Sequence, residues 1–216
     1  MPDRNCGREK EIRQKYDTFA SFYNLIEGIP ELFVIRHLRK KLIPQATGKV
    51  LEIAVGTGKN LCYYPEICQI TGIDNSTAMV KIARKRMKKL KRHVTFFIMD
   101  ASTLAFRDQS FDTVVSSLCL CTFADPVAAL IEMDRVCRTD GQILLLEHGR
   151  SSQKWLRSLQ DCTVDCCVKG LGCHWNREPL NLIRQAGLRI VYAQCSFLGV
   201  FYLIKARPSG VFGNTA

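Results

Sequence analysis

The sequence predicts an α/β fold: a doubly wound sheet of seven strands, mostly parallel, with helices on both faces and an antiparallel hairpin at the C-terminal end. Three observations predict it. Short apolar runs alternate with helical segments through the first two thirds of the chain. A glycine turn directly follows the first apolar run. Two strand-like runs near the end are joined by a turn too short for a parallel connection, which needs about a dozen residues.

Two helical segments precede the first strand. Apolar spacing predicts a helix over residues 9–26 and another over 30–42. The second should stop before Pro44, because the residue before a proline resists the helical conformation. At 216 residues, 47% of them hydrophobic, the chain is expected to form a single domain over 1–208 with its own core.

Five strand-like runs follow, at residues 49–54, 69–74, 94–99, 111–118 and 142–147. We expect helical segments between the first three strands. A further helix is expected over 126–138, with Pro126 in its first turn. Strands and helices that alternate in this way form a parallel sheet through right-handed crossovers.

The chain changes character after the fifth strand. Residues 150–173 are expected to be irregular and helical, with Trp155, Leu159, Cys162 and Cys166 on one side. A helix over 177–185 and strands over 188–194 and 200–206 should complete the fold, and residues 209–216 should fray.

Much of the net charge of +11 lies between residues 81 and 92. Met79, Ala83, Met87 and Leu90 recur there at helical spacing, which predicts an amphipathic helix with a cationic outer face. Such a face is usually a solvated surface; anionic lipid, an acidic substrate and nucleic acid are the alternatives.

Targeting signals and cysteine spacing bear on the compartment. The eleven cysteines show no disulfide framework, and no secretory signal opens the chain. No stretch approaches the roughly 18 apolar residues that span a bilayer. We expect a cytoplasmic protein, with attachment to the surface of a membrane as an option. No nucleic-acid partner is expected, because no recognition module is appended.

The glycine turn lies in VLEIAVGTGKN (residues 50–60), and GIDNS (72–76) follows it. A glycine turn and a strand-end acid, here Asp74, suit a ligand whose ribose hydroxyls donate to the carboxylate. The third glycine of a dinucleotide fingerprint is absent, since Leu61 follows Asn60. The phosphate-binding lysine pattern is also absent, because Asn60 replaces serine or threonine.

The wider motif set resembles the class I S-adenosylmethionine-dependent methyltransferases, of the type 11 or ubiquinone/menaquinone-methyltransferase-like group. LEIAVGTG, GIDNS, MDAS (99–102) and the segments FDTVVSSLCLCTFADP and RVCRTDGQILLLEH are similar to the family's motifs in order and spacing. The similarity runs from Tyr16 to about Glu147 and implies a Rossmann-like sheet. One departure is Ala54, which stands where the family usually has its first glycine; its methyl group could narrow the approach to the ligand.

The resemblance implies S-adenosylmethionine as cofactor and S-adenosylhomocysteine as product, with site residues at matching positions. Glu52 would orient the loop or bind the ligand's amino group, and Asp74 would accept both ribose hydroxyls. The other implied contacts are Ala54, Gly56 and Gly58 at the methionine part, Asn75, Met79, Asp100 and Ala101 at the adenine, and Ser117 and Leu118 at the sulfonium. A structural strand-end role for Glu52 and a capping role for Asp100 are the alternatives.

Shorter similarities point to a subgroup. KYDTFASFYN (15–24) looks like the entry segment of ubiquinone/menaquinone C-methyltransferases and bacterial phosphatidylethanolamine N-methyltransferases. LCLCTFADP, LLLEHG and CHWNRE (173–178) are more similar to membrane-associated methyltransferase-like proteins, which include thiol S-methyltransferases. Residues 1–44 would then be a helical lid with Tyr16 and Tyr23 closing over the cofactor; aromatic packing within a helix is the alternative.

Methyl transfer from a sulfonium is an in-line displacement, so the protein mainly aligns the reactants and excludes water. A base is needed only for an acceptor that loses a proton. His148, just beyond the fifth strand, is the first candidate base, with a structural histidine as the alternative, and His174 is the second. Cys119 and Cys121 are expected to line the pocket.

No metal is expected. The set Cys162, Cys166, Cys167, Cys173 and His174 lacks the paired C-x2-C spacing of structural zinc sites.

Residues 150–177 are expected to form an insertion on the acceptor side. Their apolar side chains favour a small hydrophobic acceptor (a lipid, quinone or thiol) or a membrane-facing surface. These apolar side chains are Trp155, Leu156, Leu159, Val164, Val168, Leu171 and Trp175. A noncatalytic S-adenosylmethionine-binding protein and a nicotinamide oxidoreductase are the alternative functions.

Overall fold

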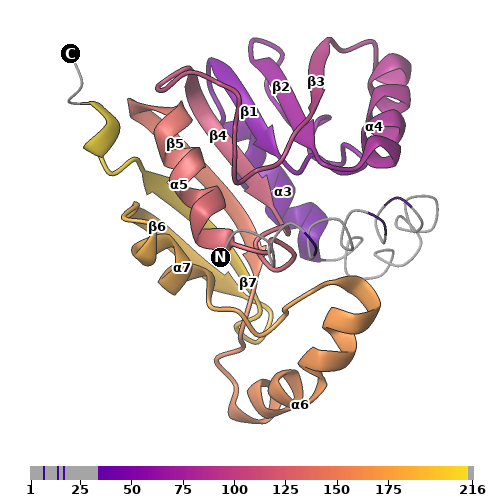
Figure 1. The fold of residues 1–216 in the computed structure, drawn as a ribbon, viewed down its shortest axis with the longest axis vertical. Helices are drawn as coiled ribbons and strands as arrows, with labels where there is room; N and C mark the ends of the chain where they lie inside the picture. The colour runs from indigo at the N-terminus through magenta and orange to yellow at the C-terminus, as the bar shows by residue number, and fades with distance from the viewer. Residues whose placement is uncertain (1–6, 8–13, 15–16, 18–33, 214–216) are drawn as a thin grey trace.

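The computed structural model describes residues 7, 14, 17 and 34–213. Their centre is one seven-stranded sheet with the order β3-β2-β1-β4-β5-β7-β6 (Figure 1). The strands are β1 Lys49–Ile53, β2 Gln69–Asp74, β3 Val94–Ile98, β4 Phe111–Ser117, β5 Cys137–His148, β6 Arg189–Ser196 and β7 Phe201–Arg207. All neighbours pair in parallel except β7, which is antiparallel to both β5 and β6. The predicted fold class is confirmed.

The central strand β1 separates the two helical layers. Leu51 and Ile53 face one apolar cluster, and Val50 faces the other, as the two-residue period of a strand requires. Helices α5 (Pro126–Val136) and α7 (Pro179–Gln185) cover the first cluster, while α3 (Arg36–Leu42) and α4 (Thr77–Leu90) cover the second. The core therefore lies on both faces of the sheet.

The chain order reverses beside β1, and this places the site. β1 pairs with β2 on one side and with β4 on the other, so consecutive crossovers leave in opposite directions. In open parallel sheets such a switch point forms a crevice at the carboxyl ends of the strands.

The prediction of a helix between the first two strands, β1 and β2, is wrong. Residues 54–68 form a series of turns, in which Gly58 N donates to Val55 O at 2.9 Å and Tyr63 N donates to Asn60 O at 2.8 Å. Gly56 and Gly58 have φ of +54° and +77°, outside the right-handed helical region, so a helix cannot continue through them.

Several expected boundaries shift. β5 begins at Cys137, five residues before the expected strand, and α5 accordingly ends at Val136. α3 ends at Leu42, before Pro44 as expected, and a short 3-10 helix, η2 (Ile43–Gln45), follows. The expected helix over 9–26 lies outside the described residues.

Helix α4 follows the predicted amphipathic pattern with one exception. Met79, Ala83 and Met87 are buried, but Leu90 is exposed at the end of the helix. The basic outer face is also smaller than expected. Arg92 lies just past the helix and donates to the carbonyls of Leu61, Tyr64 and Pro65, so it anchors the turns after β1.

Helix α6 (Lys154–Leu171) lies apart from the sheet, beyond its carboxyl end (Figure 1). Gln160 is its buried residue, and its side-chain amide donates to the carbonyls of Gly149 and Trp175, both at 3.0 Å. The side that carries Trp155, Leu159, Cys162 and Cys166 is exposed. The polar contacts of Gln160 hold the helix to the body, and the apolar side chains of Leu156, Val164 and Val168 are half-buried.

The first residues of the expected frayed tail contact the body. Ser209 N donates to Asp134 Oδ1 at 2.8 Å, and Phe212 O accepts from Gln109 Nε2 at 3.0 Å. A short 3-10 helix, η3 (Val211–Gly213), ends the described chain.

Candidate active site

A cleft of about 840 Å³, part of it open to solvent, lies at the carboxyl ends of β1, β2 and β4. It brings together most of the predicted cofactor-binding residues: Ala54, Gly56, Asp74, Asn75, Met79, Asp100, Ala101, Ser117 and Leu118. Sequence reasoning missed several wall residues, namely Ile73, Met99, Ser102, Thr122, Phe123, Ala124, Asp125 and Ala129. Several of these residues are sequence neighbours of the predicted positions. This proximity was the signal from which they could have been predicted. Cys119 lines the cleft as expected; Cys121 is buried and is not part of its wall.

Asp74, at the end of β2, fastens the glycine turn to the sheet. Its Oδ2 accepts from Gly56 N at 2.8 Å, and its Oδ1 accepts from Ser76 N at 2.9 Å. Burial raises the pKa of Asp74 to about 6, although these two N–H donors act to lower it. The carboxylate is therefore oriented on the cleft wall before any ligand arrives.

Two non-glycine residues of the cleft have left-handed backbone conformations. Ala54 has φ of +49° and Leu118 has φ of +57°. This conformation costs about 1–2 kcal/mol for a residue with a Cβ atom. Strain of this kind gathers at functional sites, where the surrounding structure imposes it. The departure at Ala54 thus keeps the glycine-like backbone and adds a methyl group to the wall.

Glu52 belongs to a buried polar network behind the cleft rather than to its wall. Asn60 Nδ2 donates to Glu52 Oε1 at 2.9 Å and to Ser117 Oγ at 3.0 Å, and Arg39 donates to Asn60 Oδ1. Burial raises the pKa of Glu52 to about 7. The neighbouring side chains of Asn60, Tyr64 and Arg39 act in the opposite direction. Ser117 links this network to the cleft.

One oxygen of Glu52 lacks a partner among the described residues. Oε2 is buried, and although the Tyr64 hydroxyl lies near enough to influence its pKa, neither atom reaches hydrogen-bond geometry. A buried carboxylate oxygen without a donor is costly unless a ligand or water supplies one.

Gly58 serves packing in this structure. A Cβ atom there would come within 2.9 Å of Leu61 Cδ1 and 3.2 Å of Ala83 Cβ, so the turn could not lie against α4. Its contact with the methionine part of a ligand stays a prediction.

The predicted lid residues Tyr16 and Tyr23 lie outside the described residues. Asp17, which is described, accepts hydrogen bonds from Ser76 Oγ at 2.5 Å and Ala78 N at 3.3 Å. This position of the N-terminal segment therefore lies at the start of α4, next to the cleft residues Asp74 and Asn75.

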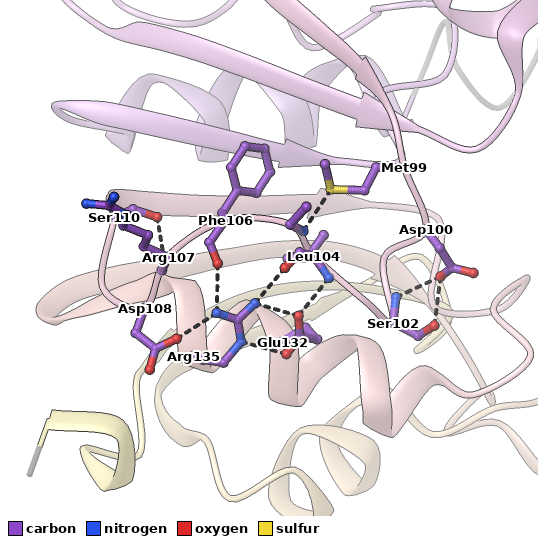
Figure 2. A network of polar contacts seen from close by, with 11 residues as sticks. Met99, Asp100, Ser102, Leu104, Phe106, Arg107, Asp108, Ser110, Glu132 and Arg135 are labelled. Atoms are coloured by element: carbon purple, nitrogen blue, oxygen red, sulfur yellow. Dashed lines mark hydrogen bonds and ion pairs between the residues drawn. The ribbon is translucent and has the colours of Figure 1, made fainter. Parts of the chain in front are cut away.

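The loop after β3, which carries Asp100 and Ala101, is held by a polar network (Figure 2). Asp100 Oδ1 accepts from Ser102 N at 2.7 Å and Ser102 Oγ at 2.8 Å, which closes a turn. Farther along, Arg135 of α5 donates to the carbonyls of Leu104 and Phe106, both at 2.8 Å (Figure 2). These contacts show the local capping role of Asp100, and its contact with the adenine stays a prediction.

Past β4, the loop 118–123 is tied to Glu147 near the end of β5. The buried Glu147 carboxylate accepts from Ser116 Oγ at 2.8 Å, Cys119 N at 3.1 Å and Leu120 N at 3.3 Å. Burial raises the pKa of Glu147 to about 7. This carboxylate orients the loop whose Leu118 and Cys119 face the cleft.

The segment after α6 closes on the same loop. His174 N donates to Cys121 O at 2.9 Å, and Arg177 donates to Phe123 O at 2.9 Å and to Leu120 O. Residues 173–177 are thus docked against the wall of the cleft through backbone carbonyls. Residues 150–177 are not among those that line the cleft.

The candidate base His148 contacts a cysteine. Its Nε2 lies 3.4 Å from Cys173 Sγ. Hydrogen bonding from Cys121, together with His148, lowers the pKa of Cys173 to about 5. Burial lowers the pKa of His148, but the contact with Cys173 outweighs it and the net direction is upward. His148 does not line the cleft, so its role as base stays a prediction, and so does that of His174.

With this geometry in place, comparison with known proteins assigns the family. Residues 51–145 match the model of a methyltransferase domain. Residues 51–145 thus form a methyltransferase domain, in agreement with the resemblance of the motifs. The matched segment contains the end of β1, all of β2 to β4 and most of β5, together with every residue that lines the cleft. This match favours the methyl-donor interpretation of the glycine turn over the nicotinamide one.

Curated relatives agree with the family. The chain is 30% identical over 216 residues to the mitochondrial methyltransferase OMS1 of Saccharomyces cerevisiae, covering 90% of this chain and 46% of OMS1. It is 37% identical over 103 residues to a phosphatidylethanolamine N-methyltransferase of Cereibacter sphaeroides, covering 47% of this chain and 51% of that protein. Other relatives are named as demethylmenaquinone methyltransferases and as a thiol S-methyltransferase. The chain thus spans about half the length of the first two relatives.

Solved structures share the fold. A SAM-dependent methyltransferase from Thermotoga maritima, described as a possible histamine N-methyltransferase, aligns with a TM-score of 0.68 at 22% identity, covering 91% of this chain and 99% of that one. The [4+2]-cyclase SpnF also aligns, with a TM-score of 0.64 at 18% identity over 80% of this chain and 79% of that one. These likenesses show the fold alone.

The family implies S-adenosylmethionine as methyl donor, and the residues present fit it. The cleft combines the carboxylates of Asp74 and Asp100 with the apolar side chains of Ile73, Met79 and Met99. Behind it, Glu52 Oε2 is buried without a donor among the described residues. Hydroxyl groups, an adenine ring and a cationic amino group are the chemistry that such a set accommodates. Among the described residues, no helix has both the length and the apolar character needed to span a bilayer.

Proposed function

We propose that this chain binds S-adenosylmethionine in the cleft and transfers its methyl group to a small hydrophobic acceptor. The observation that carries the proposal is Asp74, a buried carboxylate held by Gly56 N and Ser76 N at the switch point of the sheet. The donor, when bound, supplies a methyl group already activated by the sulfonium.

The chain's own residues would bind and orient the donor. Asp74 would accept from the ribose hydroxyls, while Asn75, Met79, Asp100 and Ala101 would surround the adenine. Gly56 would leave room for the methionine part, since an added Cβ there would have only Ala54 O within 4 Å, at 3.9 Å. Glu52 would attract the amino group from behind the glycine turn, and Ser117 and Leu118 would border the sulfonium.

An acceptor of lipid, quinone or thiol class is supported by two features. Relatives named for phosphatidylethanolamine, demethylmenaquinone and thiol substrates match this chain. In addition, the segment 150–177 carries Trp155 and Leu159 on its exposed side, with fractional exposures of 62% and 47%. An apolar surface next to the site suits an acceptor that partitions into a membrane.

Attachment to an anionic membrane surface belongs to the same proposal. Lys81, Arg84, Lys85, Lys88 and Lys89 are exposed along α4, and each cationic side chain near such a surface contributes about 1 kcal/mol. A nucleic-acid acceptor is not proposed. We also leave the general base unassigned, because His148 lies against Cys173 rather than on the cleft wall.

The proposal is tested by transfer of labelled methyl groups from S-adenosylmethionine to a panel of acceptors: an alkyl thiol, a demethylated quinone, and phosphatidylethanolamine in vesicles. We expect label in one of these classes and none with Asp74→Ala at the same donor concentration. Label in no acceptor, with donor binding intact, would contradict catalysis.

That last outcome would favour the second candidate, a protein that binds S-adenosylmethionine without transferring its methyl group. The likeness to a protein named as a [4+2]-cyclase supports keeping this candidate, because the same fold occurs under another activity.

A further inference from the structure

Three potential metal ligands from distant parts of the chain meet beside the cleft. Cys121 lies in the loop after β4, His148 is the last residue of β5, and Cys173 follows the end of α6. One atom of each, Sγ, a ring nitrogen and Sγ, lies within 4.8 Å of both others. Cys121 is buried and the other two are half-buried, so the cluster is partly shielded from solvent.

The spacing of these atoms suits a tetrahedral ion. Zinc binds cysteine sulfur at about 2.3 Å and histidine nitrogen at about 2.0–2.1 Å, so neighbouring ligand atoms lie about 3.5–3.8 Å apart. His148 Nε2 and Cys173 Sγ are 3.4 Å apart, close to that separation. Two sulfurs and one imidazole nitrogen form a donor set that favours zinc over magnesium or calcium.

The backbone holds the three residues together by contacts that need no metal. His174 N donates to Cys121 O at 2.9 Å, which joins the residue after Cys173 to Cys121 directly. Arg177 fastens the same segment to Leu120 O and Phe123 O. His148 is fixed by its place in β5, where it pairs with Phe201 of β7.

The adjacent carboxylate cannot serve as a fourth protein ligand in this arrangement. Glu147 is buried and accepts from Ser116 Oγ and from the N–H groups of Cys119 and Leu120. Among the described residues, the cluster therefore consists of three ligands. Three protein ligands with one remaining position are typical of zinc sites that bind water or a substrate atom.

We propose that Cys121, His148 and Cys173 bind one zinc ion, whose fourth position accepts water or an external thiol. The site is distinct from the cofactor cleft but shares its loop, because Leu118, Cys119, Thr122 and Phe123 line the cleft on either side of Cys121. The inference does not depend on the identity of the methyl acceptor. It replaces the base role of His148, since a nitrogen bound to zinc has no lone pair for a proton.

The expectation of no metal was based on a different group of cysteines. Cys162 and Cys166 are exposed on α6, away from the three ligand atoms, and Cys173 is the one member of that group that the cluster contains. His148 lies 27 residues after Cys121 in the chain, and Cys173 lies 52 residues after Cys121. No local sequence spacing therefore indicates the proposed site.

The experiment is metal analysis of the full chain, purified under reducing conditions and loaded with zinc or, in parallel, cobalt. We expect one zinc per chain after dialysis and, with cobalt, the sulfur-to-metal absorption of a tetrahedral thiolate site. Cys173→Ser and His148→Ala should each weaken zinc binding at least tenfold, measured by competition with a chromophoric chelator. Cys162→Ser, an exposed cysteine on the neighbouring helix, is the matched control and should bind zinc as the unchanged chain does.

Folding and donor binding of each variant are measured as controls. Circular dichroism and S-adenosylhomocysteine affinity should be retained in Cys173→Ser, which alters a half-buried residue outside the cleft. If His148→Ala does not fold, Cys173→Ser alone decides the question. The open position is tested by adding 2-mercaptoethanol to the cobalt form, which should shift the absorption; an unchanged spectrum would overturn an open position.

Three results would overturn the zinc site itself. One is a chain that retains no zinc at micromolar free metal and shows no thiolate absorption with cobalt. Another is equal loss of zinc in Cys162→Ser and Cys173→Ser. The third is a Cys121–Cys173 disulfide in the chain as purified under reducing conditions and without a chelator, shown by thiol counting and peptide mapping.

Discussion

The cleft and the neighbouring segment that we propose as the acceptor side are built in different ways. The cleft forms where β1, β2 and β4 end, and short contiguous motifs supply most of its walls. The proposed acceptor side joins the loop 118–123, the end of β5 and the segment 173–177 through contacts such as His174 N to Cys121 O. The cleft is therefore formed by residues that are close together in the sequence. The other region is formed by residues that are far apart in the sequence and meet only in the fold. Donor binding and acceptor chemistry should therefore respond to different mutations.

The largest expected effect tests the cleft. Asp74→Ala removes the proposed acceptor for the ribose hydroxyls and also frees Gly56 N and Ser76 N. Hydrogen bonds to a charged group contribute about 1.5–3 kcal/mol each, so S-adenosylhomocysteine should bind at least about tenfold more weakly. Isothermal titration calorimetry measures this change.

Asp112→Ala is the matched control. Asp112 Oδ2 also accepts from a backbone group, Lys49 N at 2.8 Å, but at the amino end of β1, and it does not line the cleft. The Asp112→Ala variant should bind S-adenosylhomocysteine with an affinity within about twofold of that of the unchanged chain. Equal losses in both variants would mean that the effect of Asp74 is one of folding.

The second prediction concerns the pH dependence of donor binding and tests the roles proposed for Asp74 and Glu52. In the free protein, burial raises the pKa of Asp74 to about 6 and that of Glu52 to about 7. The charged carboxylates would bind the donor, so affinity should be highest above pH 8 and fall as pH drops through 7 and then 6. Glu52→Gln should remove the upper part of this decrease. A pH-independent affinity between 5.5 and 8 would contradict both roles.

The third prediction separates the acceptor side from the cleft. Arg177→Met removes the donors to Leu120 O and Phe123 O and should destabilise the protein by about 2 kcal/mol. Turnover should fall several-fold because the segment 173–177 loosens, while S-adenosylhomocysteine affinity changes by less than about twofold. Thermal unfolding, steady-state kinetics and calorimetry together check this.

Arg138→Met controls for loss of an arginine. Its partners Asp112 and Asp140 form exposed ion pairs, which contribute little to stability. Donor affinity that falls with Arg177→Met as much as with Asp74→Ala would show that the two regions are not separable.

The smallest expected effect is at Ala54. Ala54→Gly relieves a left-handed backbone that costs about 1–2 kcal/mol but makes the unfolded chain more flexible, for a net stabilisation of about 0.5–1 kcal/mol. Donor affinity should be unchanged or higher, since a methyl group leaves the wall. Chemical denaturation measures the difference.

Ala128→Gly lies in α5 and should do the opposite, destabilising by about 1 kcal/mol. Destabilisation by both substitutions would contradict the strain assigned to Ala54.

The sequence predicted most of the sheet and of the cleft, because both depend on short-range patterns. Alternation within strands and the glycine turn before Asp74 needed no knowledge of distant residues. Where tertiary contacts overrode local signals, prediction failed. No helix forms after β1, because the left-handed Gly56 and Gly58 and the carbonyls bound by Arg92 impose turns.

Residues that act through long-range contacts could not be found from the sequence. Asn60 matters because it joins Arg39, Glu52 and Ser117, which lie on three separate segments. Arg135 holds the loop after β3 from the facing helix (Figure 2). Asn60 lies in the glycine-turn segment and Arg135 opens the segment RVCRTDGQILLLEH, but only the fold reveals which residues they contact.

The central claim is that the cleft binds S-adenosylmethionine, and titration of the full chain with S-adenosylhomocysteine, with NAD run in parallel, tests it most directly. We predict saturable binding at one site per chain for S-adenosylhomocysteine and no measurable heat with NAD. Absence of binding by S-adenosylhomocysteine, or preferential binding of NAD, would contradict the account.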